Sequence, residues 1–198
     1  MSTLFPNIIL LDRRPDIVEA WEDHFTGVPG ITTVIGSFND KIADIIVSPA
    51  NSFGFMNGGI DFAYTQFFGP QIQEKVQSSI KTNFGGELLI GQALLVQTDH
   101  VQFPYMIAAP TMRLPMKITD PADVFLATRA ALRIAVRMQN AVDGQLTILF
   151  PGMGTGAGMI PPDFCADHMR KAYDAVRYGE TFPASWEEGL QRTYGPRK

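Results

Sequence analysis

Two glycine-rich segments, each between a short apolar run and a helix-like stretch, constrain the fold of this chain more than any other feature. The first spans residues 51–61 and follows the apolar run 45–47; the second spans 151–158 and follows the run 145–150. A strand, a glycine loop and a helix in this order form an anion site, because small residues let the backbone approach a ligand and the free N–H groups of the helix start point toward negative charge. Two such loops predict a ligand with two phosphates, or one long ligand held between two clamps.

Strands and helices alternate along most of the sequence. Strands are expected at residues 8–11, 31–35, 45–47, 93–98, 105–109 and 148–150, and helices at 12–26, 60–68, 70–84, 119–140 and 161–178. The tail, 179–198, is polar and irregular in pattern. This alternation predicts a layered α/β fold with a substantially parallel sheet, in which ligands lie at the carboxyl ends of the strands. Both glycine loops follow strands, so we expect them to line one cleft.

The bulk composition is that of a single globular domain. The chain has 198 residues, of which 45% are hydrophobic and 18% charged, and its formal net charge of −4 argues against a nucleic-acid binder that relies on charge alone. The single cysteine, Cys165, excludes an intramolecular disulfide and is expected to be a packing residue. The first residues lack a basic signal-peptide segment, and no apolar run reaches about 18 residues, so a cytoplasmic protein without a membrane span is expected.

Several common chemistries do not fit the motifs. Neither glycine loop has the Gly-Lys-Ser/Thr ending of a P-loop, and the spacing at 152–158 is not that of a Rossmann fingerprint. We therefore set aside ATP hydrolysis and nicotinamide redox chemistry. The histidines His24, His100 and His168 are scattered and no cysteine pair exists, so neither a metal site nor a cofactor is expected.

Polar and aromatic side chains in the two loops are the candidates for ligand contacts. The Asn51 amide could hydrogen-bond a sugar hydroxyl, or Asn51 could simply be a turn residue. The Asp61 carboxylate could bind a donor group of the ligand, orient a water molecule, or cap the helix. Thr155 offers a hydroxyl and an N–H group to a phosphate, and Phe53 and Phe55 offer faces on which a ring or ribose packs.

Arginines recur every four residues on one expected helix, at Arg129, Arg133 and Arg137. Such a row is typical of a solvated helix face, and its sharper interpretation is a contact with RNA or with a partner.

The two loops together resemble the signatures of the macro domain family, which binds ADP-ribose. The family has a strand ending in Asn-Ala-Ala-Asn and then a loop closing with Gly-Gly-Val-Asp; residues 44–51 and 58–61 match these. Residues 150–158 match the family's loop around the diphosphate, and 106–110 match the strand between. Residues 109–113 resemble a bacterial or phage-type branch, and the resemblance covers about residues 31–178.

The resemblance implies a three-layer α/β/α fold with a mixed sheet and ADP-ribose lying across the strand ends. It implies a single domain, 1–198, with a core at about 31–178, an N-terminal strand-helix addition at 1–30 and a tail at 179–198. Carried over by position, Asn51 and Asp61 are the expected catalytic residues. The expected ligand-binding residues are Ser37, Phe38, Ala50, Asn51, Gly58, Gly59, Ile60, Gly152, Gly154, Thr155, Gly156, Ala157, Gly158 and Met159.

The chain departs from the family pattern at four places, one of which is the second loop, where the aromatic residue often found in the family is replaced near Ala157 and Met159. Ser37 stands where the family has an aspartate that reads the adenine amino group, and a serine supplies no carboxylate. Ser48 replaces the first asparagine of the strand motif, and residues 55–57 make the first loop bulkier than the all-glycine version.

The function implied is binding of ADP-ribose or a close derivative, with hydrolysis of ADP-ribosyl or O-acetyl-ADP-ribose linkages as a further step. Binding and hydrolysis use nearly the same residues, so the sequence leaves open whether the protein is an enzyme. The alternatives are a non-catalytic reader or accessory module that binds a nucleotide or an RNA end, and a macro fold that serves only as an interaction scaffold.

Overall fold

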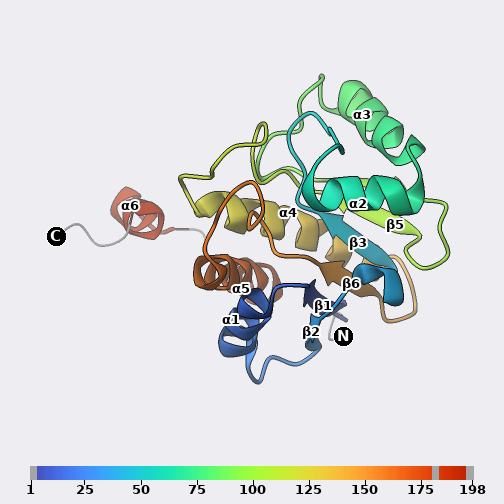
Figure 1. Cartoon of the computed structure of the whole chain (residues 1–198). Helices are drawn as coiled ribbons and strands as arrows, with labels where there is room; N and C mark the ends of the chain where they lie inside the picture. Colours follow the sequence, from blue (N-terminus) through green and yellow to red (C-terminus); the bar gives the residue numbers. More distant parts are fainter. Residues whose placement is uncertain (1–3, 180–182, 195–198) are drawn as a thin grey trace.

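A mixed, mostly parallel β-sheet forms the middle layer of the protein (Figure 1). The computed structural model describes residues 4–179 and 183–194, and within them the sheet has six strands in the order β2-β1-β6-β3-β5-β4. The strands are β1 (Asn7–Asp12), β2 (Ile31–Ile35), β3 (Ile45–Ser48), β4 (Leu94–Gln97), β5 (Tyr105–Ala108) and β6 (Thr147–Phe150). Only β4 runs antiparallel to its neighbour, because the short connection after it returns the chain directly as β5.

Helices cover both faces of this sheet (Figure 1). One layer contains α1 (Pro15–Phe25), α4 (Ala122–Gln139) and α5 (Pro162–Tyr178); the other contains α2 (Gly59–Phe68), α3 (Gln71–Asn83) and the short 3₁₀ helix η1 (Phe38–Asp40). The predicted three-layer α/β/α fold is therefore confirmed. The expected bounds of these elements agree with the observed ones to within a few residues.

Alternation along the central strands produces two separate cores. In β3, Ile45 and Val47 face the core beneath α1, α4 and α5, whereas Ile46 faces the core beneath α2 and α3. Strand β6 repeats the pattern, since Phe150 joins the first core and Leu149 the second. Strands with apolar residues on both faces are typical of a parallel sheet covered on both sides.

The N-terminal segment supplies an interior strand. β1 pairs in parallel with β2 on one side and with β6 on the other, and Leu10 lies opposite both Thr33 and Phe150. The described part of the segment 1–30, which was expected as an addition to the core, thus brings the end of β1 beside the ends of the strands that carry the glycine loops.

The tail differs from the prediction of an irregular segment, because α6 spans Trp186–Tyr194. The Ser185 hydroxyl accepts a hydrogen bond from the Glu188 N–H, and the Glu188 carboxylate accepts one from the Ala184 N–H. This reciprocal arrangement is close to a capping box, a helix-start signal that the polar composition of the tail concealed. No helix in the described part of the chain combines the length and apolar composition needed to cross a membrane.

Candidate functional site

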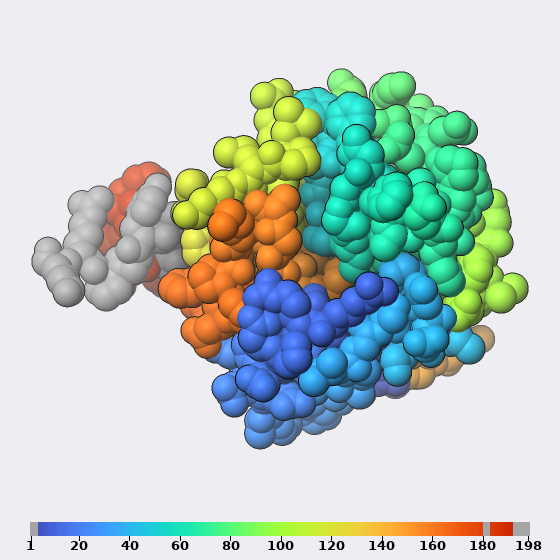
Figure 2. Space-filling view, viewed as in Figure 1, coloured from blue at the N-terminus to red at the C-terminus, as the bar shows by residue number. Residues whose placement is uncertain are grey.

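A pocket of about 470 Å³ lies at the carboxyl ends of β1, β3 and β6. Its walls come from the ends of β1 and β2, the first glycine loop with the start of α2, the loop after β5, and the second glycine loop. Figure 2 shows the hollow between the blue N-terminal segment, the teal first loop and the orange second loop. The prediction that both glycine loops line one cleft is confirmed.

The first loop is held by the side chain of Asn51. Its Oδ1 accepts hydrogen bonds from the N–H groups of Phe53 and Phe55, both at 3.2 Å, and its Nδ2 donates to the Phe55 carbonyl at 2.7 Å. Asn51 is 6% exposed, so three of the four bonds available to its amide are used inside the loop. The structure shows that the Asn51 side chain binds its own loop, and a contact between this side chain and a ligand stays a prediction.

The start of α2 presents free amides to the pocket. Phe62 is the first residue of this turn whose N–H donates a hydrogen bond, to the Gly58 carbonyl at 3.1 Å. Among the described residues, the N–H groups of Gly59, Ile60 and Asp61 have no hydrogen-bond partner. Unpaired amides and the helix dipole favour an anion at this point.

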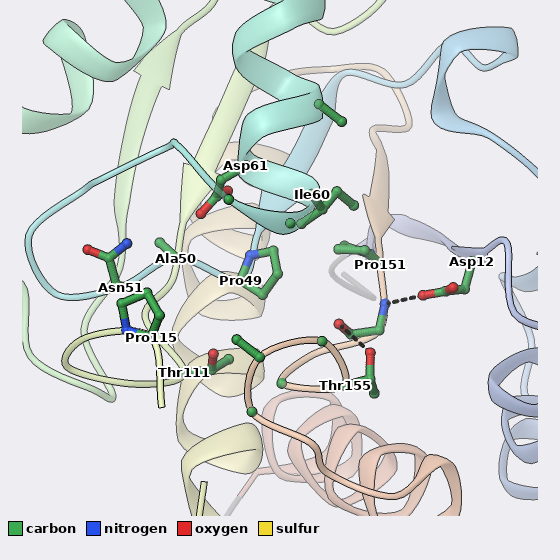
Figure 3. A pocket seen from close by; sticks show the side chains of 18 of the residues that line it. Asp12, Pro49, Ala50, Asn51, Ile60, Asp61, Thr111, Pro115, Pro151 and Thr155 are labelled. Carbon is green, nitrogen blue, oxygen red and sulfur yellow. Dashed lines mark hydrogen bonds between the residues drawn. The ribbon is translucent and has the colours of Figure 1, made fainter. Parts of the chain in front are cut away.

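The second loop faces α2 from the opposite wall and is fixed by its neighbours. The Asp12 carboxylate accepts a hydrogen bond from the Gly152 N–H at 3.2 Å, and the Thr155 hydroxyl donates to the Gly152 carbonyl at 3.2 Å (Figure 3). Below it, the Cys165 thiol donates to the Met153 carbonyl at 3.3 Å. Burial raises the pKa of this thiol to about 12, so it remains protonated at neutral pH and acts as a donor, not as a nucleophile.

The amides of this loop are also free, and its glycines are not equivalent. In the part of the chain that the structure describes, the N–H groups of residues 154–158 have no hydrogen-bond partner. A Cβ added at Gly158 would lie 2.4 Å from the Gly154 carbonyl oxygen, so this glycine is required by packing. A Cβ at Gly156 would meet no atom within 4 Å, so this glycine leaves space open in the pocket wall.

Asp61 lies at the pocket wall in the first turn of α2 (Figure 3). It is 7% exposed, and the Ser48 hydroxyl donates a hydrogen bond to its Oδ1 at 2.5 Å. Burial raises the pKa of the Asp61 carboxyl to about 6, and the Ser48 hydrogen bond opposes part of that rise. The group therefore changes from neutral to ionised just below neutral pH.

Two arginines from the end of β1 line the pocket as well. Arg13 donates a hydrogen bond to the Ser37 hydroxyl at 3.3 Å, and Arg14 forms an ion pair with Asp16 at 2.5 Å. The Arg14 guanidinium also approaches the Thr155 carbonyl oxygen at 3.5 Å. The pocket wall thus holds two guanidinium groups that the sequence analysis did not assign to it, beside the carboxyl groups of Asp12 and Asp61.

The part of the sequence from β3 to α5 matches a known protein family. The family model described as "Macro domain" matches residues 47–169. The chain belongs to the macro domain family. An uncharacterized protein of Aquifex aeolicus is 33% identical over 139 residues, which are 70% of this chain and 78% of that one.

Solved macro domains share the fold at low sequence identity. An Oceanobacillus iheyensis macrodomain with ADP has a TM-score of 0.58 and 21% identity, and the match covers 69% of this chain and 70% of that one. A Thermosipho africanus DarTG structure in complex with ADP-ribose has a TM-score of 0.52 and 14% identity, with 66% of this chain and 35% of that one covered.

The pocket of this macro domain contains all but one of the residues predicted to form its site. Those brought together are Ser37, Phe38, Ala50, Asn51, Gly58, Gly59, Ile60, Asp61, Gly152, Gly154, Thr155, Gly156, Ala157 and Gly158. Met159 does not line the pocket; it has a φ of +54° and is 66% exposed, because the turn that bonds its N–H to the Gly156 carbonyl directs it outward.

Sequence reasoning missed a further set of lining residues. They include Asp12, Arg13, Arg14, Pro49, Asn57, Thr111, Met112 and Pro115, whereas Phe55, which also lines the pocket, was a predicted candidate. Asp12 is the last residue of β1, and Arg13 and Arg14 follow it directly, so the same strand-end argument that singled out the glycine loops was available for them. They also precede residue 47, where the family match begins.

The predicted row of arginines lies apart from the pocket. Arg129, Arg133 and Arg137 are on α4 and do not line it; the Arg129 guanidinium lies 5.0 Å from the centre of the Phe125 ring. Within residues 4–179 and 183–194, no three side chains of His, Cys, Asp or Glu form a group that could hold a metal ion.

Proposed function

We propose that this macro domain binds ADP-ribose or a close derivative, with the pyrophosphate between the two loops. The observation that carries the proposal is the pair of facing amide sets, residues 59–61 at the start of α2 and 154–158 in the second loop. Backbone N–H groups of this kind hold phosphate oxygens without a lysine or a metal ion. Adenosine then extends toward Ser37 and Phe38, and the distal ribose toward Ala50 and Asn51.

Calorimetry with ADP-ribose, ADP and AMP side by side tests this proposal. We expect ADP-ribose to bind most tightly and AMP, which has one phosphate, most weakly. Undetectable heat with ADP-ribose at millimolar concentration overturns the proposal, whatever the result with the other two nucleotides.

We further propose that the protein hydrolyses an ADP-ribosyl or O-acetyl-ADP-ribose linkage with Asp61 as the residue that orients or activates water. A carboxylate in a pocket wall with a pKa of about 6 is ionised at neutral pH and suited to accept a proton. For an ADP-ribosyl linkage, water would lose its proton to Asp61 as its oxygen bonds to the distal ribose carbon and the bond to the leaving group breaks. For an O-acetyl ester, the water oxygen would instead bond to the acetyl carbonyl carbon, and the bond between that carbon and the ribose oxygen would break. Ser48 holds Oδ1 and thereby fixes the direction of Oδ2.

Turnover and binding, measured together, separate the enzyme from a reader. Replacing Asp61 by Asn should abolish release of ADP-ribose while changing its binding far less. Binding by the unaltered protein without any turnover of these substrates would identify a non-catalytic reader.

A further inference from the structure

Arg13 and Arg14 are adjacent in the sequence and both line the pocket, but only one of them is neutralised. Arg14 donates to both carboxylate oxygens of Asp16, at 3.1 and 2.5 Å. Among residues 4–179 and 183–194, Arg13 donates one hydrogen bond, to the neutral Ser37 hydroxyl, and no carboxylate lies within ion-pair distance of it. Its side chain is exposed at the pocket wall, so its charge and most of its N–H donors face the cavity or solvent.

The strand register places this charge at one defined end of the pocket. β1 and β2 are neighbours in the sheet, and the Asp12 carbonyl accepts the Gly36 N–H at 2.9 Å. Arg13 directly follows Asp12, the last residue of β1, and Ser37 directly follows Gly36, the residue after the end of β2. Figure 3 shows Asp12 at the opposite end of the pocket from Asn51 and Pro115, with the amide loops between.

The two amide loops already account for the charge of a pyrophosphate. A further cationic group beyond them has no anion to bind in plain ADP-ribose, whose remaining groups are sugars and a neutral base. Ser37 matters here because a carboxylate at this position would both neutralise Arg13 and repel an anion. In dinucleotide-binding folds, likewise, an acidic residue serves the free ribose hydroxyl and an arginine accommodates a ribose phosphate.

We infer that Arg13 and Ser37 form a third anion subsite, for a phosphate on the adenosine ribose. The inference rests on the proposed function and narrows its ligand to ADP-ribose 2′-phosphate, the form released from phosphorylated nicotinamide dinucleotides. The guanidinium holds two phosphate oxygens with parallel N–H groups, and the Ser37 hydroxyl donates to an oxygen of the same group.

Titration calorimetry with ADP-ribose and ADP-ribose 2′-phosphate tests the subsite. The unaltered protein should bind the 2′-phosphate about tenfold more tightly, a difference that falls as salt rises. Arg13→Gln should remove the preference, so that the variant binds the two ligands with affinities within about twofold of each other. Ser37→Asp should reverse the preference. Arg133→Gln, which removes the same charge from an exposed site on α4, should retain it.

Each adverse outcome has a distinct meaning. If the unaltered protein binds ADP-ribose but gains nothing from the 2′-phosphate, or if the gain survives Arg13→Gln, the subsite is overturned while the proposed function stands. A preference for ADP-ribose carrying the extra phosphate on its distal ribose also overturns this placement. Failure to bind ADP-ribose at all overturns the proposed function itself.

Discussion

The hydroxyl of Ser48 donates a hydrogen bond of 2.5 Å to Oδ1 of Asp61, joining the end of β3 to the first turn of α2. Both residues are buried, and one turn later the Tyr64 hydroxyl donates to the Val47 carbonyl at 3.1 Å. These two contacts fix α2 on β3, and with it the direction in which the free amides of the helix start point.

Asp61 makes the stability of the protein depend on pH. Its pKa is raised from 3.8 to about 6 in the folded state, so the folded state favours the protonated form. Stability from this group is complete below pH 3.8 and is lost as pH rises through 6, a fall of about 3 kcal/mol. Asp61→Asn removes the titration, so the variant should melt above the unaltered protein at pH 8 and close to it at pH 4. Melting temperatures across this range measure the effect.

Ser48→Ala serves as the control for this effect. The Ser48 hydrogen bond favours the ionised carboxyl, so its loss should raise the folded-state pKa of Asp61 further. The fall in stability should then extend to higher pH and become larger, while it still begins near pH 3.8. Parallel stability curves for the unaltered protein and Asp61→Asn would show that the carboxyl does not titrate as described.

Two glycines of the second loop should respond differently to the same change. Gly156→Ala places a methyl group in open space at the pocket wall, so the fold should tolerate it while ADP-ribose affinity drops about tenfold by contact with the pyrophosphate. Gly158→Ala forces a methyl group against the Gly154 carbonyl and should cost about 2 kcal/mol or more of stability. Melting temperature and calorimetry on both variants distinguish the two roles. Equal destabilisation by both would contradict the assignment.

The positions of the two loops could be predicted from the sequence, but the partners of their side chains could not. Alternating apolar runs fix the strand ends, and glycines after them mark where backbone approaches a ligand. Whether the Asn51 amide faces a ligand or its own loop depends on the path of residues 53–55, which no local pattern specifies. Arg13 was not predicted to line the site, because no glycine loop follows β1 to mark that strand end. Its position beside Ser37 results from the pairing of β1 with β2.

Asn51 should act through the loop that it holds. Asn51→Ala removes three hydrogen bonds to residues 53–55, which should cost about 2 kcal/mol and speed amide exchange at Phe53 and Phe55. Asn57→Ala is the matched control, since Asn57 also lines the pocket but is exposed at the start of α2. It should leave exchange in the loop unchanged. Slow, unaltered exchange at Phe53 in Asn51→Ala would mean that the loop does not depend on this amide.

Two buried hydroxyls give a prediction independent of any ligand. The Oγ1 atoms of Thr111 and Thr128 have no hydrogen-bond partner in the part of the chain that the structure describes, and both residues are at most 2% exposed. Burying an unpaired hydroxyl is costly, whereas valine has nearly the same shape and no polar group. Thr128→Val in α4 and Thr111→Val at the pocket wall should therefore each raise the free energy of unfolding by about 1 kcal/mol. Denaturant titration measures this, and because Thr111 lines the pocket and Thr128 does not, a loss of stability confined to Thr111→Val would reveal a water bound to that hydroxyl from the pocket side.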